Sequence, residues 1–266
     1  MSTSYAALCT DFYVNQRIAL KLDLPTSRET LLHLFDRVRR EHPSMDRFRR
    51  YEDELALESP DDRRSYSWVS LRRTSVRSGW VNPESFEQAY RLHRLLLDTT
   101  PYFLSISPLD IDHIELVYGF DFEVAPEINR DEVVFSALLA DSPLASLVDR
   151  GAETVIDAQP LIGIALAPPE GSGEGAPEGS AAAPGRPAPF TAYVEVKTRA
   201  RPESPATRGE AEPISVYLTV RRLGAIRSLD ECAAIFSGLV EHAEHLADSR
   251  VVPHVVAPIH AALLGR

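Results

Sequence analysis

The sequence has few cysteines and no long apolar run, and each shortage excludes a class of protein. Only two of its 266 residues are cysteines, Cys9 and Cys232, which lie far apart and lack metal-ligand spacing. We therefore expect no disulfide framework. No apolar run approaches the roughly 20 residues that a membrane-spanning helix needs. The N-terminus lacks the basic and apolar regions of a signal peptide, so we expect a cytoplasmic protein without membrane contact.

The common signatures of catalysis are missing too. The sequence has no G-x-S-x-G nucleophile elbow, no P-loop and no G-x-G-x-x-G dinucleotide motif, and we expect no cofactor. The net charge of −11 argues against a general affinity for nucleic acid, because phosphate binding depends on cationic side chains. The first 80 residues differ, with 14 basic against 12 acidic residues, so a local arginine-rich patch stays open as an alternative.

The clearest pattern is Asp112–Val124, DHIELVYGFDFEV, in which apolar residues occupy every second position. This alternation predicts a long β-strand with one buried face and one wetter face. Similar periodicity upstream predicts five more elements: strands at 17–24, 52–58 and 66–77, and helices at 26–40 and 82–100. Thr26 and Glu29 form a capping-box pattern at the first helix, and Asn82 is the expected cap of the second. The order βαββαβ predicts a ferredoxin-like layer of four antiparallel strands, with both helices on one face.

The remainder of the chain predicts an α-β-β-β-α-α order. The expected elements are helices at 129–139, 228–248 and 255–264, and strands at 154–166, 190–199 and 214–222. Residues 167–189 contain six prolines and five glycines without apolar periodicity, a composition typical of a disordered linker. We therefore predict an α+β protein with a ferredoxin-like domain at 1–126. A second α+β half at 127–266 would pack on the first sheet or extend it.

This layout resembles a sporadically distributed family of uncharacterised bacterial proteins. The resemblance rests on the order of elements and on short strings such as IELVYGFDFE and SVRSGWVNPESFEQAY. It covers most of the chain, with the proline- and glycine-rich segment as an insertion. It implies a bacterial α+β protein and brings no known activity, cofactor or catalytic residue.

Two groups of residues are candidates for a binding site. Arg72, Arg73 and Arg77 lie near two tryptophans and have the chemistry to bind a phosphate or stack on a base. His113 and Glu115 fall on the wetter face of the 112–124 strand. The acidic residues of that strand would repel phosphate, so we expect salt-bridged surface arginines rather than RNA binding.

A metal site is a further candidate, in the helical segment 241–245 with the order E-H-A-E-H. His242 and Glu241 each have the spacing to share a helix face with His245, and His254 and His260 lie downstream. The order differs from the H-E-x-x-H zinc motif, so solvated helix-surface charge is the expected interpretation. We predict no metal ligands here and no catalytic residues elsewhere.

A well-patterned scaffold without convergent chemistry favours a non-catalytic interaction or accessory module that binds another macromolecule. The expected partner is a protein, and a homodimer is left open. One alternative is a metal-dependent hydrolase or phosphoryl-transfer enzyme that uses acids of the 112–124 strand, such as Asp121 and Glu123. The other is RNA binding through the arginine-rich first third.

Overall fold

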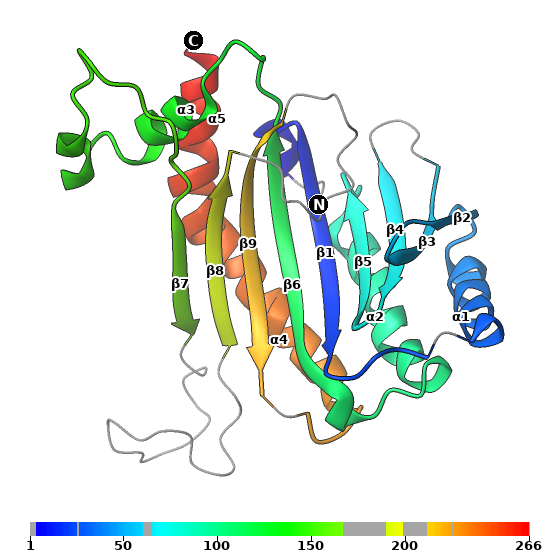
Figure 1. Ribbon diagram of the computed structural model, residues 1–266. Helices are drawn as coiled ribbons and strands as arrows, with labels where there is room; N and C mark the ends of the chain where they lie inside the picture. The colour runs from blue at the N-terminus through cyan, green and yellow to red at the C-terminus, as the bar shows by residue number, and fades with distance from the viewer. Residues whose placement is uncertain are drawn as a thin grey trace, which may run out of the picture.

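The computed structural model describes residues 4–25, 27–60, 65–166, 190–198, 212–224 and 226–265. The interpretations of Thr26 and of 167–189 therefore lie outside the described residues. The strands are β1 (Asp11–Leu20), β2 (Arg47–Arg50), β3 (Glu54–Glu58), β4 (Tyr66–Arg72), β5 (Ser75–Val81), β6 (Ile111–Phe122), β7 (Leu161–Leu166), β8 (Phe190–Lys197) and β9 (Ile214–Leu223). All of them join in one antiparallel sheet with the order β2-β3-β4-β5-β1-β6-β9-β8-β7 (Figure 1).

The helices are α1 (Arg28–Glu41), α2 (Phe86–Phe103), α3 (Arg130–Leu138), α4 (Glu231–Leu246) and α5 (Ala257–Leu264). A π-helical segment, Ala247–Val256, joins α4 to α5 without a break. In Figure 1, α2, α4 and α5 lie behind the sheet on one of its faces. The mixed composition of helices and one antiparallel sheet confirms the α+β class.

The core forms between the helices and the sheet face that they cover. Ile114, Leu116 and Tyr118 of β6 are completely buried on this face, as the alternation predicts. Phe12 of β1 and Phe236 of α4 are also fully buried, so apolar residues from both ends of the chain share one core. The other face of the sheet carries the alternate, more polar residues and is called the open face below.

Several predicted elements need correction. The strand expected at 66–77 is two strands, β4 and β5, with a tight turn at 73–74. The first strand begins at Asp11 and ends at Leu20 instead of spanning 17–24, and β2 was not predicted at all. Four strands therefore separate α1 from α2, where the βαββαβ pattern has two, and the ferredoxin-like layout is not confirmed.

The helix caps and the later boundaries also differ from expectation. Ser27 caps α1, and Ser85, not Asn82, caps α2. Asn82 instead takes a left-handed backbone (φ 47°), and its side chain bonds the Phe12 backbone N–H. The strand expected from residue 154 begins only after Pro160. The two C-terminal helices are parts of one continuous helical stretch.

The sheet has an internal two-fold layout. Exchanging β1 with β6, β5 with β9, β4 with β8 and β3 with β7 reproduces the strand order in reverse. The helices follow the same correspondence, because α1 follows β1 as α3 follows β6, and α2 follows β5 as α4 follows β9. Within the described residues, β2 is the one strand without a counterpart. The second half therefore extends the first sheet through the β1–β6 pair.

Candidate functional site

The open face carries a row of charged residues across its central strands. The register places Arg77 of β5 beside Arg17 of β1, then Glu115 of β6, then Arg221 of β9. Glu115 Oε2 accepts hydrogen bonds from Arg221 Nη2 at 2.6 Å and Nε at 2.9 Å, and Glu115 Oε1 lies 3.8 Å from Arg17 Nη1. One buried carboxylate therefore links both halves of the sheet.

His113 belongs to the same cluster. Its Nδ1 lies 2.8 Å from Asp112 Oδ2, and its Nε2 lies 3.5 Å from Glu115 Oε2. Burial acts to raise the pKa of Glu115, but His113 and Arg221 outweigh it and lower that pKa to about 2. Glu115 is consequently an ionised, paired carboxylate rather than a proton carrier at neutral pH. This arrangement is suited to holding strands together and to presenting arginines on a surface.

The predicted binding residues do not form a single patch. Arg77, His113 and Glu115 occupy neighbouring positions of the open face. Arg72 also lies there, but its Nε is 2.6 Å from Glu54 Oε2. Arg73 sits in the β4–β5 turn, largely exposed, with its Nε 3.6 Å from Asp23.

Aromatic residues on the open face were missed by the sequence analysis. The Tyr13 and Tyr217 rings lie 6.3 Å apart in an edge-on contact, and Arg221 lies over the Tyr193 ring at 5.7 Å. A Cβ at Gly119 would collide with the Tyr13 ring, so the absence of a side chain there makes room for the tyrosine. The sequence contains the pattern that predicts this placement, since these tyrosines alternate with the buried apolar residues of their strands.

Asp121 lies at the tyrosine end of the open face. It stands directly opposite Asp11 across the β1–β6 pair and accepts a hydrogen bond from the Tyr13 hydroxyl at 3.3 Å. Burial raises the pKa of Asp121 to about 6, and Asp11 adds to the shift, while bonds from Ser215 and Tyr13 oppose it. Among the described groups that shift this pKa, none is an arginine, whereas Arg221 lowers the pKa of Glu115.

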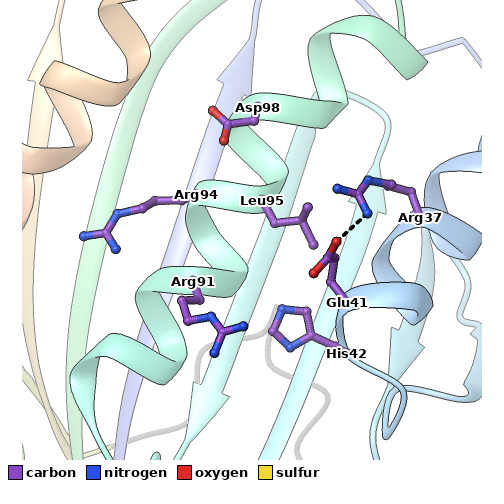
Figure 2. A pocket seen from close by; sticks show the side chains of 7 residues that line it. All are labelled: Arg37, Glu41, His42, Arg91, Arg94, Leu95 and Asp98. Carbon is purple, nitrogen blue, oxygen red and sulfur yellow. Dashed lines mark hydrogen bonds and ion pairs between the residues drawn. The ribbon is translucent and has the colours of Figure 1, made fainter.

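A cleft of about 280 Å³ lies between α1 and α2 (Figure 2). Its lining residues are Arg37, Glu41, His42, Arg91, Arg94, Leu95 and Asp98. Figure 2 shows the Arg91 guanidinium beside His42, with the 2.6 Å ion pair of Arg37 and Glu41 above them. Burial, with a contribution from Arg91, lowers the pKa of His42, which is therefore neutral at pH 7.

The charges in this cleft are largely satisfied. Figure 2 shows Arg94 directed away from the cleft, and its Nη1 pairs with Glu87 at 2.9 Å. Asp98 and Glu41 offset much of the remaining positive charge. The described residues that line the cleft include no serine, threonine or cysteine.

The predicted metal candidate does not assemble either. The His242 ring packs against Phe190 at 4.9 Å between ring centres. Over the ranges that the structure describes, no three His, Cys, Asp or Glu side chains come close enough together to hold a metal ion.

The two edges of the sheet differ strongly in chemistry. β2, with the sequence RFRR, is exposed throughout and carries three arginines. β7, with the sequence LIGIAL, has no charged or hydrogen-bonding side chain. Leu161 is 59% exposed and Ile162 is 61% exposed. No strand in the described part of the chain pairs with the outer side of β7.

Further apolar side chains are exposed outside the sheet. They are Leu144 and Leu147 in the short helical turn Pro143–Leu147, Ile156 in the loop that leads to β7, and Leu264 at the end of α5. In Figure 1 the segment between α3 and β7 projects outward past the β7 edge. This projecting segment, residues 139–160, is called the arm below.

Comparisons with known proteins returned no relative: no family model, no curated protein and no solved structure matches this chain. None of the described helices combines the length and the hydropathy required to cross a bilayer.

Proposed function

We propose that this protein is a cytoplasmic, non-catalytic interaction module that binds another polypeptide along the free edge of β7. The observation that carries the proposal is an edge strand of six residues without a charge, whose Leu161 and Ile162 are mostly exposed. Sheet edges present unpaired backbone groups, and folded proteins commonly guard them with charge, proline or a covering segment. An unguarded apolar edge is the surface used in β-strand addition.

The backbone of β7 has a defined set of outward groups. The Val196 N–H donates to the Pro160 carbonyl at 3.0 Å, which fixes the phase of the β7–β8 ladder. Bonded and non-bonded pairs alternate in an antiparallel ladder. Leu161, Gly163 and Ala165 therefore direct their N–H and C=O groups away from β8. An added strand would find three donors and three acceptors along this edge.

The RNA-binding alternative has weaker support. The open face carries Tyr13, Tyr193 and Tyr217 with several arginines, which is the residue mixture that stacks on single-stranded bases. Glu115 and Asp121 lie among them, and the Arg221 guanidinium already forms an ion pair with Glu115. We also propose that the sheet contains an elaborated ferredoxin-like arrangement, with β4 and β5 as its hairpin and β1 between β5 and β6.

The test removes one outward N–H from the free edge of β7. Ala165→Pro deletes a donor at the free edge, where proline is tolerated because the position makes no bond to β8. Ala165→Ser is the matched control, since it keeps the donor and nearly the same size. We expect a tagged wild-type chain and Ala165→Ser to capture the same polypeptide from the native cell, and Ala165→Pro to lose it. Equal capture by all three would refute β7 as the binding edge.

A further inference from the structure

We infer that the strand added to β7 is β7 of a second copy of this chain, in a two-fold symmetric antiparallel pair. This inference rests on the proposed function and names its partner. It would join the two nine-stranded sheets into one continuous sheet, with all helices on the same face. Such a contact is closed and isologous, which is the commonest arrangement in soluble homo-oligomers.

The internal symmetry of the fold identifies a place for an added strand. β7 is the counterpart of β3, and β3 is covered on its outer side by β2 in antiparallel orientation. The equivalent place beside β7 is not filled by any strand that the structure describes. The first half therefore demonstrates that this position of the layout accepts one more antiparallel strand.

The chemistry of β7 favours its own copy as the occupant. A two-fold axis through the edge makes the pair antiparallel, as are all the neighbours within the sheet. In the register centred on Gly163, Ile162 of one copy faces Ile164 of the other, and Leu161 faces Ala165. Side chains on one face of the first copy's sheet then lie beside side chains on the same face of the second copy's sheet. Because the strand is uncharged, no like charges oppose each other, although each chain carries a net charge of −11.

The arm supplies the contact area that a short strand lacks. Six residues extend only about 20 Å, and stable protein interfaces bury about 1,200–2,000 Å² in total. The arm enters β7 at its N-terminal end and projects past the edge (Figure 1). In an antiparallel pair this end lies beside the C-terminal end of the partner strand. Each arm would consequently bring the exposed Leu144, Leu147 and Ile156 toward the other copy.

The experiment measures the molar mass of the full chain by light scattering and by sedimentation over a range of concentrations. We expect the wild type to have twice the 29.5 kDa of one chain, about 59 kDa, at micromolar concentration. Ile162→Lys and Ile162→Glu each place two like charges diagonally across the two-fold axis, about 7–8 Å apart, and should raise the dimer dissociation constant at least about 100-fold. A 1:1 mixture of the two variants should recover the dimer, because opposite charges then meet.

Phe48→Lys on β2 is the matched control. Phe48 is 54% exposed, similar to Ile162, and lies on the opposite edge of the same sheet. This variant should remain dimeric. The recovery of mass in the mixture also excludes misfolding as the reason why either Ile162 variant is monomeric.

The outcomes separate the two proposals. A wild type that is monomeric at all concentrations, with capture of another polypeptide that Ala165→Pro abolishes, overturns the dimer and leaves the proposed function intact. A dimer unaffected by Ile162→Lys and Ala165→Pro places the contact elsewhere and overturns the inference. A monomer without captured polypeptide overturns both proposals.

Discussion

β2 and β7 are the two edge strands of the sheet, and each belongs to a different half of the chain. β2 presents three arginines in four residues, whereas β7 presents six residues without a charge. Charged edge strands resist pairing with other chains, and uncharged ones invite it. Apart from β2, which is an additional strand of the first half, the two halves connect their described strands in the same order. On the proposed function, the charges of β2 protect one edge against association, and the uncharged β7 leaves the other edge available to a partner.

The two edges are also attached to the sheet in different ways. The Arg49 Nε of β2 lies 3.0 Å from Glu58 Oε2 of β3, and the Tyr51 hydroxyl donates to Glu58 Oε1 at 2.8 Å. Glu58 itself is buried. In contrast, the six side chains of β7 offer nothing to an ion pair, so β7 depends on its backbone ladder with β8 and on apolar contacts. A charge-removing substitution should therefore loosen β2 and leave β7 unaffected.

The largest effect is expected for Arg49→Leu. Removing one partner of a buried ion pair typically destabilises a protein by about 3–5 kcal/mol, and we expect about 2 kcal/mol here because Arg49 is half exposed. Chemical denaturation gives the change in unfolding free energy. Hydrogen exchange should show faster opening of residues 47–58 with no change at 161–166.

Arg47→Leu is the control for this variant. Arg47 lies on the same strand and has no ion-pair partner among the described residues, so its replacement should change stability by less than about 0.5 kcal/mol. Equal losses for the two variants would show that the ion pair with Glu58 does not attach β2.

The sequence predicts long strands better than short or hairpin-forming ones, and the reasons are local. β6 was found because its alternation continues for twelve residues. β2 has four residues, three of them arginines, and carries no apolar alternation. The β4–β5 hairpin was read as one strand because its turn at Arg73 and Thr74 lacks the Asn-Gly or Gly signal of a two-residue hairpin.

The candidate site was harder to predict because it depends on pairing order. Glu115 and Arg221 are 106 positions apart, and only the β6–β9 pair brings them together. The alternation of the 112–124 strand predicted which of its residues lie on the open face. It did not predict that β9, which carries Arg221, pairs with this strand. The apolar run LIGIAL reads equally well as a buried central strand or as an edge, since sequence periodicity does not define the order of strands.

The β1–β6 pair, where the two halves meet, gives the second prediction. Arg17 and Glu115 attract each other near one end of this pair, whereas Asp11 and Asp121 repel each other at the other. The pKa of Asp121 is raised to about 6 in the fold, above the value of the unfolded chain. Its contribution to stability is therefore fully present below pH 4 and is lost as the pH rises through 6.

Asp121→Asn should remove this loss. The shift of about two pKa units sets an upper limit of about 3 kcal/mol, and weaker bonds to Tyr13 and Ser215 reduce the expected gain to about 1 kcal/mol at pH 8. The variant should also flatten the dependence of unfolding free energy on pH between 4 and 7. A variant less stable than the wild type at pH 8 would mean that the two hydrogen bonds outweigh the charge repulsion.

The smallest effect is expected from opening the guarded edge. Arg47→Thr combined with Arg50→Val removes two charges from β2 and keeps the Arg49–Glu58 pair. We would place this double change in the Ile162→Lys chain, so that association through β7 does not hide it. We expect weak self-association, visible by sedimentation velocity only at concentrations of about 100 µM, because four residues pair over a short length. The control is the Ile162→Lys chain alone. If both chains stay monomeric, the shortness of β2, and not its arginines, prevents association at that edge. The two edge strands would then differ in length as well as in charge.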